Sequence, residues 1–521
     1  MGSAVAAAPI PVSNVRQRRA VFDRQRLACI VLAGLVPVLL RLLLLPWFPP
    51  PLPAVPDESA HLLVGQTFAE GRVTNPTHPM WQHFESLFIL QQPTYTGKYQ
   101  PGYGATVALG MRLARHPWAG TLLTEALALS VLTWVLFLWL PRRWAMLGAA
   151  LMVAQVGAGS FWTNTYLGVP TTAIGGALWL ACLRLTTRRC RTRDVLLGGV
   201  GIAILMFTRP YDAVLLAGLL VIVRGWRVVL PLTAVLAPAL AVVLWYNAQV
   251  TGSAWKLPYQ VAREQYGVPQ TFFWEKPVQH TDFRHAEVRR VYEAQLEMHE
   301  TRRHPLELLA LLASRVVIVW RDYFHVGWLP VLLFVPAVLA MRSMRLLTRV
   351  LAAFLIAQGL YFYFAGAYLA PVYGALVIVL VQAVRLLRWK APRAGVAALA
   401  MIAAGPVVSL AAIPLGITLP GWLPSVQKDW FRNPVRAAVY AELGKKPSPQ
   451  LVIVRYGEGH DLRDEYVYNT PRIDDAHVVW ARDMGEERNE ELFRYYPQRE
   501  AWLLEPDAKP YRLTPLTSKN H

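Results

Sequence analysis

The chain has 521 residues, of which 55% are hydrophobic and 16% charged, and its formal net charge is +19. Several apolar runs of about 18 residues or more contain no acid, which is typical of membrane-spanning helices and excludes an ordinary soluble protein. From Thr418 onward, 15 Lys and Arg face 16 Asp and Glu, so the excess of positive charge belongs to the first 417 residues. There it forms short clusters between apolar runs, a topology signal rather than a nucleic-acid-binding surface.

The N-terminal residues 1–26 are basic and precede a first apolar run at Leu27–Phe48. This run is too long for a signal-peptide core, so we expect an uncleaved first span after a cytoplasmic N-terminus. Further spans are expected at Thr121–Leu140, Ala145–Phe161, Thr172–Leu185, Val195–Phe207, Ala213–Val223, Val228–Trp245, Pro330–Met341, Val350–Ala365, Pro371–Leu387 and Val396–Ile417. The basic clusters fall on one side of these crossings, and this positive-inside pattern predicts about 11 transmembrane helices within residues 27–417.

Two large loops, at about 49–118 and 248–329, are expected on the outer face. Within the first, Tyr103–Leu113 is apolar but too short to cross, which predicts an interfacial helix. Within the second, Leu306–Tyr323 is apolar but interrupted by Arg315. We expect this helix to be interfacial as well, because a crossing would place the later basic loops outside.

Residues 418–521 differ in composition from the membrane part and alternate between strand-like and helix-like runs. Helices are expected at RNPVRAAVYAEL and EELFRYY, and strands at LVIVRY, EYVYN, AHVVWARD and AWLLEPD. Such a pattern predicts a small α/β domain. The expected fold is therefore a mainly α-helical polytopic membrane protein with a small C-terminal extracytoplasmic α/β domain.

The first outer loop begins with the adjacent carboxylates Asp57 and Glu58, directly after Pro56. Proline followed by acids is typical of the first turn of a helix, where the helix dipole favours negative charge. Two neighbouring carboxylates repel each other, so one can have a raised pKa and act as a general base. A solvated helix start with no chemical role is an equally good interpretation of the spacing.

Lys98 and Tyr99 precede a Pro-Gly turn above the expected interfacial helix, where a lysine can hold a phosphate headgroup or simply extend toward water. Arg209 and Asp212 lie at an outer boundary within TRPYD, and Arg41 lies near the outer end of the first span. Ionisable groups at such positions are candidates for substrate binding, although a structural Arg–Asp pair explains them equally well.

A metal site has little support in the sequence. Glu58-Ser-Ala-His61 matches a Glu-x-x-His half-site, but such sites need a second copy from another helix, and none is found. No metal ligand is therefore predicted, and a divalent cation remains only a possible cofactor. Walker, G-x-G-x-x-G, G-x-S-x-G and C-x-x-C motifs are absent, so a mechanism driven by ATP or a nucleotide sugar has no support.

These features resemble the integral-membrane glycosyltransferases of the GT-C class, and most closely its family 39, which includes protein O-mannosyltransferases and the aminoarabinose transferase acting on lipid A. The resemblance rests on PDESAHLLVGQTFAEG, on KYQPGYGATVALG, on the many spans and on the outer C-terminal domain. The chain departs from the family pattern in having Lys-Tyr-Gln-Pro instead of a double proline and Ala367-Tyr368 where relatives have His-Tyr or Arg-Tyr.

The resemblance implies a polyprenyl-phosphate sugar as donor and a cell-envelope glycan, lipid or protein as acceptor, with Asp57 as the base and Glu58 as its neighbour. It also implies that Lys98, with Arg209, holds the lipid phosphate. The chain is expected to act at the outer face of a bacterial inner membrane, in contact with membrane lipids and without nucleic acid. A transporter or flippase for a polyprenyl-linked glycan or lipid, an O-antigen-ligase-like enzyme and an inactive scaffold remain alternatives.

Overall fold

The computed structural model describes residues 12–516 except 188, 268–271, 273, 281, 303, 418, 420–432 and 462. The membrane part contains the helices α1 (Val12–Leu43), α4 (Pro117–Trp139), α5 (Arg142–Val156), α6 (Val169–Leu185), α7 (Thr192–Met206), α8 (Pro210–Arg224), α9 (Val229–Thr251), α13 (Leu329–Leu332), α14 (Val335–Ala340), α15 (Arg345–Leu360), α16 (Tyr373–Lys390) and α17 (Pro392–Leu415). The first outer loop contains α2 (Pro56–Ala69), β1 (Ile89–Leu90), β2 (Thr96–Gly97) and α3 (Pro101–Ala114), and the second contains α10 (Pro258–Tyr266), α11 (Ala286–Thr301) and α12 (Pro305–Tyr323).

The expected fold class is confirmed: the chain is a mainly helical polytopic membrane protein with a small C-terminal sheet domain. Among the described residues, six helices are long and apolar enough to cross a membrane, or seven if one bent pair counts as a span. Helices α5 to α8 coincide with four expected spans, but with 15 to 17 residues each they are shorter than the 18 residues required of a crossing helix. The count of about 11 therefore stays a prediction.

Small residues let the central helices approach closely. A methyl group added to Gly175 of α6 would lie 2.8 Å from the carbonyl oxygen of Gly201, and one added to Gly201 of α7 would lie 2.5 Å from the carbonyl oxygen of Gly175. Close backbone approach at small residues is a general way to pack membrane helices, because hydrocarbon provides no hydrophobic driving force between them. On the outside of the molecule α9 leaves large apolar side chains uncovered, such as Leu230 and Trp245, as expected for a lipid-facing helix.

The apolar segment that contains Arg315 is followed by a sharp bend in the chain. The axes of 306–323 and 326–340 meet at 102°, the geometry of a broken span or a re-entrant loop. Arg315 does not face lipid: its guanidinium donates to the carbonyl oxygens of Gln358 and Tyr361 at 2.7 and 2.8 Å. The interfacial placement of α12 stays a prediction.

The C-terminal domain is built on a four-stranded sheet with the order β4-β3-β5-β6. Its elements are α18 (Pro434–Leu443), β3 (Gln450–Val454), β4 (Val478–Arg482), α19 (Glu486–Tyr495), β5 (Glu500–Glu505) and β6 (Arg512–Leu516). Strand β3 is parallel to β4 and β5, and β6 is antiparallel to β5. The α/β class is therefore correct, and both expected helices and three of the four expected strands are present.

The strand expected at EYVYN is wrong. This stretch is irregular, although Tyr466 and Val467 are buried against the domain core. Its alternating apolar residues are buried, but its backbone does not pair with a neighbouring strand. The strand β6 was not among the expected strands. Its sequence RLTPL contains a proline, and the strand lies at the edge of the sheet, where proline is tolerated.

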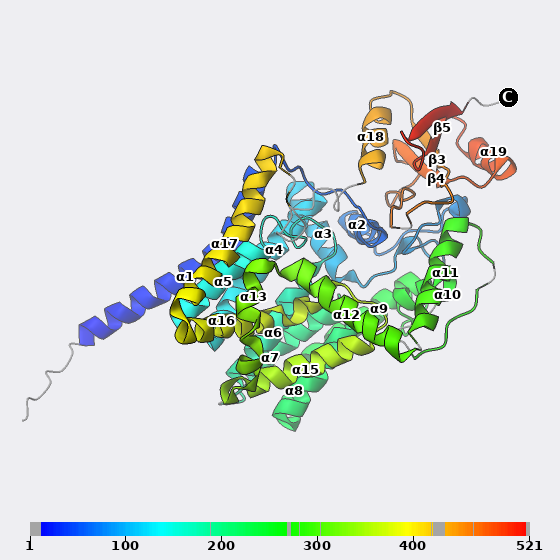
Figure 1. Ribbon diagram of the computed structural model, residues 1–521. Helices are drawn as coiled ribbons and strands as arrows, with labels where there is room; N and C mark the ends of the chain where they lie inside the picture. Colours follow the sequence, from blue (N-terminus) through cyan, green and yellow to red (C-terminus); the bar gives the residue numbers. More distant parts are fainter. Residues whose placement is uncertain are drawn as a thin grey trace, which may run out of the picture.

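The C-terminal domain lies beside α2, the first outer loop and α11, at the end of the molecule opposite the free end of α1 (Figure 1). The outer-loop residues Phe84, Ile89 and Tyr95 share a hydrophobic cluster with Leu451 and Ile453 of β3. Segments from three parts of the chain thus form one packed region, which we call the outer region after its expected side of the membrane; that side stays a prediction.

Candidate active site

Helix α2 begins as the sequence predicts, and it separates the two adjacent carboxylates. Pro56 is in its first turn together with Asp57 and Glu58. The Glu58 carboxylate accepts hydrogen bonds from the backbone amides of Ala54 at 2.8 Å and Val55 at 3.3 Å on one oxygen, and of Tyr166 at 2.7 Å on the other. Glu58 thereby fastens the helix start to the next outer turn and does not line the cavity described below.

Burial raises the pKa of Glu58 to about 7, although the three backbone amides oppose the shift. A carboxylate that accepts this many backbone hydrogen bonds has little capacity left for an acceptor substrate. Asp57, in contrast, lines the cavity. In the described part of the chain its hydrogen-bond partner is the Tyr99 hydroxyl, which donates to Oδ1.

A cavity of about 740 Å³ opens beside Asp57. Its walls come from α2, residues 85–89 and 98–103 of the first outer loop, residues 167–172 at the start of α6, the start of α8, the helices α10 and α11, residues 361–368, and Arg463 of the C-terminal domain. Tyrosines are numerous among its lining residues, namely Tyr99, Tyr103, Tyr211, Tyr259, Tyr266, Tyr361, Tyr363 and Tyr368. A site that is mostly apolar, with a few convergent charged groups, has the usual composition of a ligand pocket.

Lys98 lines this cavity and rests on aromatic rings. Its Nζ lies 3.0 Å from the ring centroid of Phe88, 5.3 Å from that of Tyr99 and 5.1 Å from that of Tyr259. Burial lowers the pKa of Lys98 to about 7, the charge of Asp57 opposes this shift, and the positive charge of Arg263 adds to it. A phosphate entering the cavity would restore the ordinary pKa by supplying the missing negative charge.

Two arginines bring further positive charge to the cavity. Arg209 lies 3.8 Å from the ring centroid of Tyr368 and donates from Nε to Asp212 at 2.6 Å. Asp212 is fully buried, accepts a second hydrogen bond from Gln358 at 2.6 Å, and is not part of the cavity wall. The expected pair is therefore present, and only its arginine faces the cavity.

Arg263 of α10 was not among the sequence candidates. Its guanidinium lies 4.3 Å from the ring centroid of Tyr259 and 4.8 Å from that of Tyr363, and it also contacts the Tyr259 hydroxyl. Lys98 and Arg263 thus share the Tyr259 ring as a neighbour. The only available sequence signal was one arginine in a loop rich in aromatic and charged residues, which is too weak to single it out.

Arg41 has a different environment from the other candidates. It is fully buried, and its guanidinium donates to Asn164 Oδ1 at 2.6 Å and to the carbonyl oxygens of Phe48 and Pro49 at 2.6 and 2.9 Å. It does not line the cavity. These bonds tie the end of α1 to the outer turn, so the structure brings Arg41 to a structural junction and not to the other candidates.

His61 lies one turn after Asp57 on α2 and also lines the cavity. Its ring stacks on Tyr99 with centroids 4.1 Å apart and meets Tyr103 edge-on at 5.1 Å. Burial, together with the charge of Lys98, lowers the pKa of His61 to about 3, so the imidazole stays neutral at physiological pH. It does not form half of a metal site with Glu58, whose carboxylate is bonded elsewhere.

The cavity carboxylates do not form a cation site. Asp57 is bonded to Tyr99, and Glu85 accepts from Tyr266 at 2.6 Å and pairs with His285 at 3.2 Å and Arg284 at 3.3 Å. Within the described residues no group of three or more His, Cys, Asp or Glu side chains has the spacing of a metal site.

The chain was compared with family profiles, with curated proteins and with solved structures. No known family profile matches the chain, and no curated protein matches it. Among solved structures, it is similar over 91% of its length to ArnT from Cupriavidus metallidurans bound to undecaprenyl phosphate, with 92% of that chain covered, 13% identity and a TM-score of 0.49.

The chain is also similar to the oligosaccharyltransferase AglB of Archaeoglobus fulgidus. For the complex with an inhibitory peptide and a dolichol-phosphate, 93% of this chain and 69% of that chain are covered, at 12% identity and a TM-score of 0.45. The expected likeness to membrane glycosyltransferases is thus found among solved structures. Likeness at this level does not transfer a function, so the function has to be argued from the cavity itself.

Proposed function

We propose that the chain is a membrane glycosyltransferase that moves a sugar from a polyprenyl-phosphate-linked donor to an acceptor hydroxyl or phosphate outside the cytoplasm. One observation carries the proposal: the carboxylate of Asp57 and the cations of Lys98, Arg209 and Arg263 line the same cavity. A base facing a cluster of cations suits a reaction in which an acceptor loses a proton while a phosphate leaves.

In the proposed reaction the acceptor oxygen bonds to the anomeric carbon of the sugar while the bond from that carbon to the phosphate oxygen breaks. The acceptor proton moves to Asp57, and the bonding electrons leave with the polyprenyl phosphate, which gains one negative charge. Lys98, Arg209 and Arg263 stabilise that charge, and the tyrosines exclude water and offer ring faces and hydroxyls to the sugar. Because the phosphate is already a leaving group, no ATP is needed.

Asp57 is the proposed base. Tyr99 donates to its Oδ1 and so fixes the orientation of the carboxylate, while the second oxygen remains for the acceptor. Glu58 and Arg41, which do not line the cavity, have structural roles in this proposal. Asp212 acts through Arg209, whose guanidinium it orients.

The deciding experiment compares wild type, Asp57→Asn and Glu70→Gln as full-length proteins in detergent. Sugar release is measured from a panel of polyprenyl-phosphate sugars with cell-envelope extract as acceptor source. We expect Asp57→Asn to lose about three orders of magnitude in rate, roughly 4 kcal/mol of transition-state stabilisation, with an unchanged thermal unfolding midpoint. Glu70→Gln, an acid-to-amide change at the far end of α2, should keep full activity. Equal activity of all three proteins would remove Asp57 from the chemistry.

A transporter of the same class of lipid is the second candidate, and the 102° bend between α12 and α14 favours it. Broken helices are common at the binding sites of transporters. A wild type that binds undecaprenyl phosphate, the lipid held by the similar ArnT structure, but consumes no donor from the panel would favour transport over transfer.

A further inference from the structure

Phe88 has a backbone conformation that its residue type disfavours. It is the third residue of a turn in which the amide of Ile89 donates to the carbonyl oxygen of Ser86 at 3.3 Å, and its φ is +67°. Positive φ at this turn position normally requires Gly or Asn, since a side chain with a Cβ crowds the backbone there. Such a conformation persists only where neighbouring contacts hold it, and it is frequent at functional sites.

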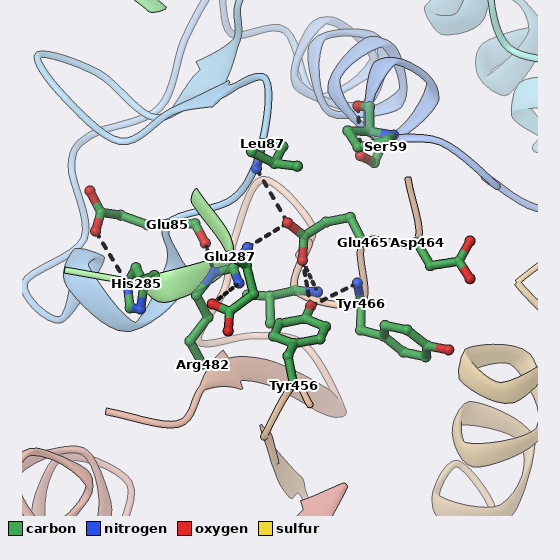
Figure 2. A network of polar contacts seen from close by, with 12 residues as sticks. Ser59, Glu85, Leu87, His285, Glu287, Tyr456, Asp464, Glu465, Tyr466 and Arg482 are labelled. Atoms are coloured by element: carbon green, nitrogen blue, oxygen red, sulfur yellow. Dashed lines mark hydrogen bonds and ion pairs between the residues drawn. The ribbon is translucent and has the colours of Figure 1, made fainter. Parts of the chain in front are cut away.

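The contacts that hold this turn come partly from the C-terminal domain. The amide of Leu87 donates to the Glu465 carboxylate at 3.3 Å, and the carbonyl oxygen of Phe88 accepts from the amide of Lys98 at 3.0 Å. Figure 2 shows Leu87 pointing its amide at Glu465, which approaches from a separate strand-end loop. A residue almost 380 positions away thus fixes the backbone next to Phe88.

Arg482 completes this connection. The residue is at the end of β4, its side chain is 2% exposed, and it donates to the Glu85 carbonyl oxygen at 2.6 Å, to Glu465 at 2.5 Å and to Glu287 of α11 at 3.3 Å (Figure 2). The Tyr456 hydroxyl donates to the other oxygen of Glu465 at 2.6 Å. The pair Glu465–Arg482 is therefore buried and hydrogen-bonded to the backbone of residues 85 and 87 of the first outer loop, and we call it the clamp.

The ring of Phe88 is the nearest aromatic support of Lys98, with Nζ 3.0 Å from its centroid. A cation held on a ring face is attracted by the ring quadrupole, and the attraction grows when both groups are out of water. Because the position of the ring follows from the backbone at residue 88, a change at the clamp is transmitted through one turn to the ammonium group.

We propose that the C-terminal domain positions the cation site of the cavity: the Glu465–Arg482 clamp holds Phe88 in its strained turn, and Phe88 holds Lys98 in the place where the leaving phosphate binds. Glu465 and Arg482 are positioning residues, since they do not line the cavity. The inference rests on the proposed function for the identity of the ligand, but the placement of Lys98 can be tested without any ligand.

The first measurement is the pH at which Lys98 becomes reactive toward an amine-modifying reagent, quantified by mass spectrometry of the full-length protein. Charged and titratable groups near Lys98 come from several elements, namely Asp57 and His61 of α2, Tyr99, and Tyr259 and Arg263 of α10. None of them is changed in the variants compared. The variants are Glu465→Gln, which weakens the clamp, and Phe88→Gly, which keeps the backbone preference and removes the ring.

We expect the reactivity midpoint of wild type near pH 7 and a rise of about one pH unit in both variants, as Lys98 moves toward water. Arg455→Met is the matched control, because it breaks the Arg455–Asp483 pair at 2.5 Å in the same domain and leaves residues 85–88 unchanged. The reactivity midpoint of Lys98 in this variant should equal that of wild type. An unchanged midpoint in both Phe88→Gly and Glu465→Gln overturns the inference. A merely structural role would lower the unfolding midpoint and leave the reactivity midpoint in place.

The second measurement is binding of undecaprenyl phosphate to the same proteins. We expect about tenfold weaker binding in Phe88→Gly and Glu465→Gln, and full binding in Arg455→Met. A shifted reactivity midpoint with no lipid binding by any protein would leave the positioning intact and contradict the proposed function. Lipid binding that weakens only in Lys98→Met would keep the proposed function and contradict the positioning role.

Discussion

Two charged clusters lie side by side in the outer region and differ in how their charges are balanced. At the junction with the C-terminal domain, Arg482 faces Glu465 and Glu287, so a buried cation has carboxylate partners. In the cavity, Lys98 lies against the rings of Phe88, Tyr99 and Tyr259, and Asp57 is a carboxylate whose charge acts on it. A ring attracts a cation without cancelling its charge, so Lys98 can still pair with an anionic ligand, whereas Arg482 is already paired with carboxylates.

This difference separates residues that hold the fold from residues that are available for binding. Completed clusters lose stability when a partner is removed, because the remaining charge is buried alone. Clusters with incomplete charge balance carry a desolvation cost in the free protein and recover it when an anion binds. The predictions below test the two clusters against each other.

The largest effect is expected at the junction. Arg482→Met should reduce the free energy of unfolding by about 3–5 kcal/mol, since Glu465 is left buried without its cation, while Glu287 keeps its contact with Arg290 at 3.8 Å. Thermal unfolding of the purified protein measures this. The surface change Arg455→Met in the same domain should cost no more than about 1 kcal/mol. An equal decrease in unfolding free energy in the two variants would mean that the buried pairs of Arg482 contribute no more to stability than an exposed pair.

Lys98→Met is expected to weaken ligand binding without lowering stability. Binding of undecaprenyl phosphate should weaken about 10- to 100-fold, because a charge-assisted contact contributes roughly 1.5–3 kcal/mol. The unfolding midpoint should not fall, since the substitution removes a buried ammonium held by rings. Lys256→Met, which breaks an exposed pair with Glu264 in the second outer loop, is the control and should bind normally. A destabilised Lys98→Met protein would place Lys98 among the structural cations.

The affinity for undecaprenyl phosphate should depend on pH, because Lys98 of the cavity titrates near neutral pH. Its pKa is lowered from 10.5 to about 7 by burial, so in the free site Lys98 loses its positive charge as the pH rises above about 7. Affinity for undecaprenyl phosphate should then decrease, by at most about tenfold per pH unit, with proton uptake on binding that calorimetry in different buffers can detect. Lys98→Met should flatten this dependence.

The lowered pKa of Lys98 also makes the free energy of unfolding depend on pH. Between pH 7 and 10.5 the unfolded chain binds the Lys98 proton more often than the folded chain does, so the contribution of Lys98 to stability increases with pH across this window. The difference in unfolding midpoint between wild type and Lys98→Met, followed across that window, measures it. A constant difference would show that Lys98 titrates alike in both states.

The smallest effect is expected for Arg463→Ala. Arg463 is the residue of the C-terminal domain that lines the cavity, but its side chain is 77% exposed and pairs with Asp461 at 2.6 Å. Exposed pairs contribute about 0–1 kcal/mol, so donor turnover should change less than about threefold. A larger loss would indicate that this arginine contacts the acceptor directly.

Local composition was enough to predict much of the fold. Helix α2 begins at Pro56 with its two acids, α3 begins with the Pro-Gly pair at Pro101, and the long apolar runs at α4, α9, α16 and α17 are helices. Their hydropathy determines their partition into lipid without reference to other segments. The prediction failed at EYVYN, whose apolar residues are buried without forming a strand, because burial against a core and pairing in a sheet produce the same alternation.

The sequence by itself therefore determined the helical class and the helix start that carries Asp57. Only the tertiary structure decided which of the two adjacent acids faces the cavity, since neighbouring residues on a helix point about 100° apart and packing selects the direction. It also brought Arg263 and Arg463 to the cavity and linked Arg482 to residue 85, over separations of hundreds of residues. Contacts at such distances depend on how helices and domains pack, and no local pattern records them.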